Sequence, residues 1–186
     1  MLKKRKLILV AGLILVFLMS LFLVKKIQAL KKNSISNSTT IRLSTTTISG
    51  AADSDVTVGI FIDTPRKAST AKVKLCYGDA LTTDVASVTN VGPLTVENSK
   101  KIENNCVIIS KRVEASATID QLPTGSFQFA NVTFKIKKNG NLTISQTESL
   151  IAGEPINVNG DVNIPIDEVV GAKVKKKWWT WKWWWN

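Results

Sequence analysis

Apolar and polar residues alternate along much of the chain between residues 52 and 153. The segments Val56–Ile62 and Ala71–Tyr77 each place an apolar side chain at every second position. A period of two is typical of strands that bury one face. Because turn residues such as Asp63-Thr64-Pro65 separate these segments, the pattern predicts an all-β, antiparallel, jelly-roll-like β-sandwich.

Further extended segments are expected at Leu81–Val91, Cys106–Ile109 and Val113–Ile119. In the next segment the apolar parity changes between Phe129 and Val132, which indicates a β-bulge near Ala130-Asn131. Asn139-Gly140 then follows, and Asn-Gly favours a two-residue hairpin because both residues tolerate positive φ. We therefore expect the strand before this turn to pair with Leu142–Ile151.

The N-terminal region departs from this pattern, because residues 7–24 are mostly apolar and carry no charge. As a helix they would be about 27 Å long, close to the roughly 30 Å hydrocarbon core of a bilayer. The sequence thus predicts one transmembrane helix before the sandwich, with the lipid bilayer as its partner. The side chains expected to lie in the lipid are Leu7, Ile8, Leu9, Val10, Leu13, Ile14, Leu15, Val16, Phe17, Leu18, Leu21, Phe22, Leu23 and Val24.

A cleaved secretory signal peptide is the alternative, with Ile27-Gln28-Ala29 as the cleavage site. Lys25 and Lys26 between this site and the apolar run favour an uncleaved signal-anchor. Equal numbers of basic residues flank the run, so charge leaves its orientation undecided. The short N-terminal tail and the Ser/Thr-rich sequence that follows favour a single-pass protein of the cell membrane with its sandwich outside the cytoplasm.

The expected organisation is therefore a series of five segments. These are a signal-anchor at 1–32, a Ser/Thr-rich stalk at 33–51, a sandwich at 52–153, a C-terminal extension or linker at 154–177, and a Trp-rich tail at 178–186. Within the stalk, Thr40–Thr47 has an alternative interpretation as an edge strand.

Charge and amino-acid composition exclude several classes of function. The formal charge of +11 comes from the two ends, and residues 33–170 carry 12 basic and 14 acidic residues, a net charge of −2. The middle therefore has no overall basic footprint for nucleic acid. The chain has no histidine, which excludes Ser-His-Asp and Cys-His catalysis and most catalytic zinc sites. We expect no catalytic residues, cofactor or metal.

Cys76 and Cys106 are the two cysteines of the chain. Outside the cytoplasm they would form a disulfide worth about 3.5 kcal/mol in the chain-entropy model; the alternative is two buried thiols. The strand parity places Cys76 on the wetter face, together with Lys72 and Lys74, which suits a disulfide between strands or from a strand to a loop better than a core thiol.

Four segments carry a resemblance to a known family, and they read VTVGIFIDT, VKLCYGDAL, GSFQFANVTFKI and GNLTISQTESLI. Together they resemble the cohesin family of bacterial cell-surface modules over about Asp53–Gly153. Gly78 stands where the family places Asp directly after Tyr. The resemblance implies a nine-stranded jelly roll related in shape to carbohydrate-binding modules. It also implies non-catalytic recognition of a protein partner, a dockerin.

All six tryptophans lie in the last nine residues, interleaved with lysine. Trp and Lys together are typical of a peptide that binds at a membrane interface. The alternative is a frameshift artefact, because TGG codons read one base later encode a Gly-rich linker.

These observations predict a membrane-anchored, extracytoplasmic binding module for protein–protein attachment at the cell surface. Two alternatives are a carbohydrate-binding module of the same architecture, with polysaccharide as partner, and a structural envelope spacer.

Overall fold

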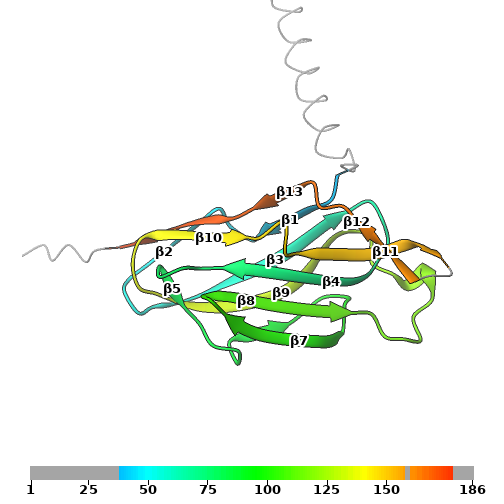
Figure 1. Cartoon of the computed structure of the whole chain (residues 1–186). Coiled ribbons are helices and arrows are strands. Elements are labelled where there is room, and N and C mark those ends of the chain that lie inside the picture. The colour runs from blue at the N-terminus through cyan, green and yellow to red at the C-terminus, as the bar shows by residue number, and fades with distance from the viewer. Residues whose placement is uncertain (1–37, 158–159, 178–186) are drawn as a thin grey trace, which may run out of the picture. The chain divides into compact units, whose positions relative to one another are not determined.

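Two β-sheets pack face to face in the computed structural model of the chain, which describes residues 38–157 and 160–177 (Figure 1). The first sheet contains, in spatial order, β13 (Glu168–Val170), β1 (Thr40–Leu43), β3 (Asp55–Thr64), β9 (Gly125–Ile136) and β5 (Leu81–Thr82), with β6 (Val88–Asn90) also paired to β9. The second contains β12 (Gly160–Ile164), β11 (Leu150–Asn157), β4 (Ala68–Cys76), β10 (Gly140–Ile144), β14 (Ala172–Lys176) and β2 (Thr47–Gly50); β8 (Cys106–Arg112) pairs with β4, and β7 (Val96–Glu103) with β8.

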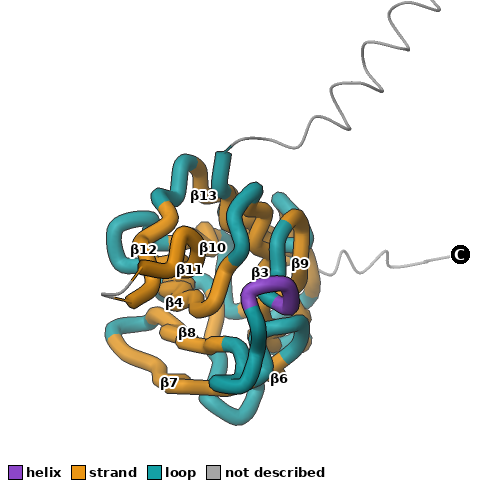
Figure 2. The backbone as a smooth tube through the Cα atoms, turned by 90° about the vertical axis from the view of Figure 1, so that its right-hand side faces the viewer, coloured by secondary structure: helices purple, strands orange, loops and turns teal. Residues whose placement is uncertain are grey.

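Figure 2 shows the two layers edge-on, with β11, β4, β8 and β7 along one side and β3, β9 and β6 along the other. A short 3-10 helix, η1 (Ile119–Gln121), lies in the loop between β8 and β9. The predicted β-sandwich is confirmed. In the two described ranges no helix is long and apolar enough to cross a membrane. The predicted transmembrane segment at residues 7–24 and the Trp-rich tail lie outside those ranges.

The core follows the predicted parity. On β3, Val58, Ile60 and Ile62 are fully buried and face Phe129 and neighbouring side chains between the sheets. Each such side chain stabilises the fold by about 1.5–3 kcal/mol. The predicted bulge is present one residue earlier than expected, because Ile60 pairs with Ala130 while Phe61 pairs with Gln128. Phe129 is the extra residue on β9.

The predicted stalk and C-terminal extension are wrong where they overlap the sandwich. Within 33–51, β1 and β2 bury Ile41 and Ile48, and within 154–177, β14 buries Val174. β1 pairs in parallel with β13, and β2 pairs in parallel with β14. Each segment also pairs with a central strand, β1 with β3 and β14 with β10. The alternative interpretation of Thr40–Thr47 as an edge strand is therefore closer to the structure than a stalk.

The predicted Asn-Gly hairpin is also wrong. β9 lies in the first sheet, whereas β10 pairs with β14 and β4 in the second. Gly140 does not have positive φ. It is required for space, because a Cβ there would lie 2.5 Å from Cβ of Ala80.

Two further extended segments differ from prediction. Val113–Ile119 forms no strand and instead makes the loop that leads into η1. The stretch 81–91 forms two short strands, β5 and β6, separated by a turn in which Asp84 accepts a hydrogen bond from the Ser87 N–H. In both cases the apolar residues are too few or too exposed to sustain one continuous strand; Val85 is 40% exposed.

Candidate partner-binding face

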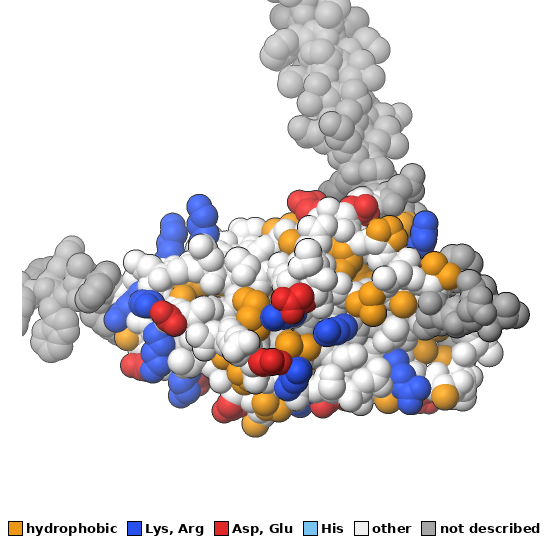
Figure 3. All heavy atoms as spheres, in the orientation of Figure 1, with side chains coloured by type: hydrophobic (Ala, Val, Ile, Leu, Met, Phe, Trp, Pro, Cys, Tyr) orange, Lys and Arg blue, Asp and Glu red, His pale blue; other side chains and the backbone are white. Residues whose placement is uncertain are grey.

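The outer face of β11, β4, β8 and β7 is a continuous surface that we call the front face, and it is turned toward the viewer in Figure 1. Strand register arranges its outward side chains in rows. One row contains Lys74, Ile108 and Lys101, and the next contains Leu150, Lys72 and Ser110. Figure 3 shows this side of the molecule with apolar surface between charged side chains. Four strands about 4.8 Å apart, with β8 of seven residues the shortest, give a footprint of at least about 19 by 24 Å.

Apolar groups lie at the centre of the front face. Ile108 is 6% exposed, although it points away from the main core and is absent from that cluster. Lys74 and Lys101 flank it in register, and their aliphatic stems are placed to cover it. Leu150 in the neighbouring row is 39% exposed. The face therefore combines separate apolar side chains with charged neighbours.

One edge of this centre is closed by a disulfide between Cys76 and Cys106. These residues are direct partners on β4 and β8. The Tyr77 N–H donates to the Asn105 carbonyl at 3.0 Å. The ladder hydrogen bond therefore lies beside the cysteines, and Cys76 and Cys106 form a non-hydrogen-bonded pair of the antiparallel ladder. Such pairs have the closest side chains in an antiparallel ladder, so the register alone brings the two sulfurs together.

The charged residues of the front face are only partly neutralised. Lys74 pairs with Glu148 at 2.5 Å, and Lys101 pairs with Glu103 at 2.7 Å. The Lys101 hydrogen bond and charge lower the pKa of Glu103, so this carboxylate stays ionised.

At the end of the front face, the loop after β8 forms a shallow hollow of about 370 Å³. Thr70 and Arg112 from the front face contribute to its wall, and the loop adds Val113 and Ile119. Ile119 is 48% exposed. The hollow therefore extends the apolar surface beyond the strands.

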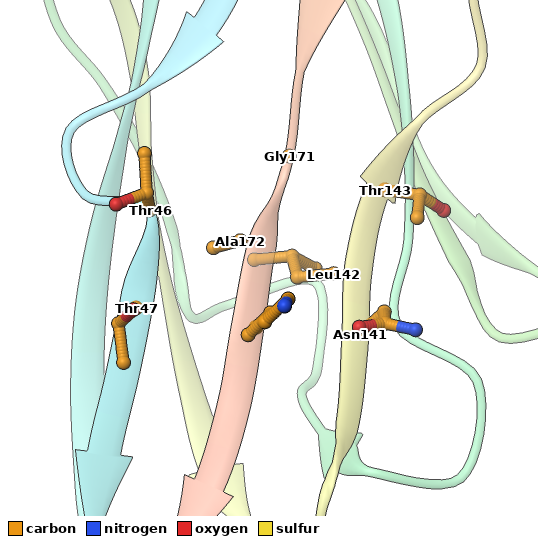
Figure 4. A pocket seen from close by; sticks show the side chains of 8 residues that line it. Thr46, Thr47, Asn141, Leu142, Thr143, Gly171 and Ala172 are labelled. Atoms are coloured by element: carbon orange, nitrogen blue, oxygen red, sulfur yellow. The ribbon is translucent and has the colours of Figure 1, made fainter.

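Figure 4 shows a second hollow on the same sheet, over β10, β14 and β2, with a volume of about 460 Å³. Thr46 and Thr47 lie on one side and Asn141 and Thr143 on the other, with β14 between them. Lys173 also lines it. These hydroxyl, amide and ammonium groups suit a hydroxylated ligand, and no aromatic side chain of the described residues contributes to the lining.

Between the sheets lies a buried lysine that the sequence pattern did not reveal. Lys111 is 1% exposed, and its Nζ donates to the carbonyls of Val91 at 2.7 Å and Phe129 at 2.8 Å. Burial lowers the pKa of Lys111 to about 8, while nearby Glu97 opposes the shift. Both bonds go to backbone carbonyls, so Lys111 ties the bulge in β9 to β8.

The predicted site residues fall into two groups. Cys76 and Cys106 lie together on the front face, whereas the lipid-facing residues of 7–24 are outside the described residues. The sequence pattern did not reveal β7, and with it Lys101, because this strand has only two apolar residues, Val96 and Ile102. In the described parts of the chain, no three His, Cys, Asp or Glu side chains gather as metal ligands.

This two-layered sandwich, with its first two strands paired in parallel to its last two and an open sheet face, is a cohesin-like fold. Solved cohesin structures match it. A non-cellulosomal cohesin from the archaeon Archaeoglobus fulgidus has a TM-score of 0.57 and 13% identity, over 76% of this chain and 92% of that one. The CaCohA2 domain from Clostridium acetobutylicum has a TM-score of 0.55 and 19% identity, over 77% and 94%.

A third similar structure is a type I cohesin–dockerin complex from Clostridium thermocellum, with a TM-score of 0.56 and 13% identity, over 76% of this chain and 100% of that one. No family model matches the sequence. No curated protein matches it either. The likeness at these identities establishes the fold, and the predicted resemblance to cohesins is confirmed at that level.

Proposed function

We propose that the chain is a non-catalytic attachment module that binds a dockerin-like protein through its front face. The observation that carries the proposal is apolar surface on an otherwise polar sheet face, exposed at Leu150 on β11 and lying between lysines at Ile108 on β8. An apolar centre with a polar rim is the usual anatomy of a protein interface. The cohesin-like fold supports the same conclusion, because one of the similar structures is a cohesin–dockerin complex.

The test uses Leu150→Asp in the full chain, held in a non-ionic detergent, against a panel of recombinant dockerin modules. We expect at least one module to bind, and Leu150→Asp to weaken that binding tenfold or more in calorimetry. The matched control is Val85→Asp, because Val85 is 40% exposed, close to the 39% of Leu150, but lies between β5 and β6. Failure of every module to bind, or equal binding by the two variants, contradicts the proposal.

We further propose that residues 7–24 hold the module at the cell membrane with the sandwich outside the cytoplasm. The support is the length and apolarity of this run. The full chain should stay with membranes after carbonate washing, and external protease should degrade the sandwich in intact cells. Release by the wash, or protection of the sandwich in intact cells, contradicts the anchor or its orientation.

A second candidate function is the binding of a soluble oligosaccharide in the hollow of Figure 4. The observation that favours it is the lining by threonine hydroxyls, Asn141 and Lys173. On a glycan array, Asn141→Ala should lower any signal severalfold, while Asn163→Ala, an exposed change on β12, should not. An array without a positive glycan removes this candidate.

A further inference from the structure

Ionisable side chains are sorted unequally between the two outer faces of the sandwich. On the strands of the first sheet, the outward ones are Arg42, Lys135, Asp55, Asp63 and Glu168, a net charge of −1. On the strands of the second sheet, the outward side chains that the structure describes are Lys72, Lys74, Lys101, Arg112, Lys173, Lys175 and Glu103, a net charge of +5. Glu148 beside Lys74 reduces this to +4.

The two faces also differ in how their cations are neutralised. On the first sheet, Arg42 pairs with Asp63 at 2.6 Å, and Lys135 pairs with Asp55 at 3.7 Å. On the front face, Lys72 and Arg112 are exposed, and neither forms an ion pair within the described part of the chain. The front face therefore carries positive charge that no acid among the described side chains cancels.

The spacing of Lys72 and Arg112, together with the apolar residue beside them, indicates the chemistry of the surface that they bind. Lys72 pairs with Ser110 and Thr70 pairs with Arg112, so the two cations lie two residues apart along the strands, about 7 Å. Leu150 is the partner of Lys72 in the register and supplies apolar surface beside it. Separate carboxylates around an apolar side chain, as on a protein surface, match this arrangement.

We infer that the partner of the front face is an acidic protein surface, with carboxylates opposite Lys72 and Arg112 and an apolar side chain against Leu150. This inference rests on the proposed function. It adds that the charge of the partner surface determines which partners bind. Complementary charge raises the rate of encounter and excludes partners of like charge.

The experiment measures binding of the full chain in non-ionic detergent to dockerin modules that range from basic to acidic net charge. We expect the acidic modules to bind best, and their association rate to fall about tenfold between 50 and 500 mM salt. The double variant Lys72→Glu/Arg112→Glu should weaken acidic modules at least tenfold and improve binding of basic ones. Lys135→Glu on the first sheet is the matched control and should change binding less than twofold.

The outcomes separate the two proposals. If Leu150→Asp weakens binding while charge reversal and salt do not, attachment through the front face stands and the acidic partner is wrong. If no module binds, or Leu150→Asp has no effect, the proposed function itself fails. Vesicles of phosphatidylglycerol that bind the front face as tightly as the acidic modules, judged by loss of binding in the double variant, would also overturn the inference. Thermal unfolding verifies that each variant is folded.

Discussion

At the scale of single residues, Lys111 is the least expected feature of the fold. A buried ammonium is normally costly, but here two backbone carbonyls accept its hydrogen bonds. One of these carbonyls belongs to Phe129, the extra residue of the bulge. A bulge leaves backbone groups unpaired, and Lys111 satisfies one of them from the opposite sheet.

This arrangement predicts an unusual dependence of stability on pH. The pKa of Lys111 falls from 10.5 to about 8 on folding, so the unfolded chain binds more protons between these values. The contribution of Lys111 to the free energy of unfolding should therefore rise as pH increases from about 8 to 10.5. Urea unfolding at several pH values measures it.

Lys111→Met provides the reference for this measurement. It removes the titrating group and leaves two carbonyls without a donor, at a cost of about 1–3 kcal/mol each. The difference in unfolding free energy between wild type and variant should widen as pH rises through this window. A difference that is constant with pH would contradict the assignment.

Gly92 gives a second prediction at this scale. Its φ is +84°, and a Cβ there would lie 1.7 Å from the Gln128 carbonyl oxygen, so Gly92→Ala must displace backbone. Gly78 also has positive φ, but a Cβ there meets nothing within 4 Å. Gly78→Ala should therefore cost only the conformational penalty of about 1–2 kcal/mol, and Gly92→Ala clearly more. Equal losses in chemical unfolding would contradict this.

The sequence predicts burial of single residues correctly where apolar and polar residues alternate. It does not predict burial that depends on tertiary contacts. The parity of β3 and β4 correctly separated the buried residues from the outward Lys72 and Lys74. The burial of Lys111 was not predictable, because the carbonyls that accept its hydrogen bonds are 18 and 20 residues away in sequence. No local pattern marks such a pairing.

At the scale of elements, Asn104 and Asn105 make a tight two-residue hairpin. Both have positive φ, 51° and 57°, and they join β7 to β8. The Asn-Gly pair was the stronger sequence signal, yet Gly140 is needed to approach Ala80. The Asn-Gly signal therefore pointed to a glycine that the fold does require, but the requirement is space beside Ala80 and not a turn conformation. β7 was missed because it lies at a sheet edge and buries little.

The disulfide gives a prediction at the element scale, because it closes a loop of 30 residues that contains β5, β6 and β7. Replacing both cysteines by serine should lower the free energy of unfolding by about 3.5 kcal/mol in the chain-entropy model. Amide exchange should show the greatest loss of protection in β7 and β8, where the register of the front face is set. Unchanged unfolding free energy and unchanged amide exchange would show that the disulfide does not stabilise the pairing of β4 with β8.

At the scale of the whole molecule, sequence composition placed the domain boundaries too far inward. The hydrogen bond from the Thr39 N–H to Asp167 joins residues separated by 128 positions. A Ser/Thr-rich segment resembles a stalk when considered alone, and distant partners, β3 and β13 for β1 and β14 for β2, make it two strands. Net charge is misleading in the same way. The middle region has a net charge near zero in sequence, but folding places more positive charge on the outer face of one sheet than on the other.

The revised boundaries predict the outcome of truncation. A fragment of residues 52–153 lacks β1, β2, β12, β13, β14 and the second half of β11, and it exposes Ile60, Leu142 and other buried side chains. It should aggregate or show no cooperative thermal transition, whereas residues 36–177 should unfold cooperatively. Cooperative unfolding of the shorter fragment would show that the terminal strands are dispensable.

The parallel terminal strands also determine how the module responds to force. The chain enters the sandwich at the start of β1 and leaves at the end of β14, and β1 with β13, and β2 with β14, run in the same direction. Tension between the two ends therefore pulls each pair along its own axis. The hydrogen bonds of a pair must then rupture together instead of opening one after another, so a module pulled from both ends should yield only under a high load.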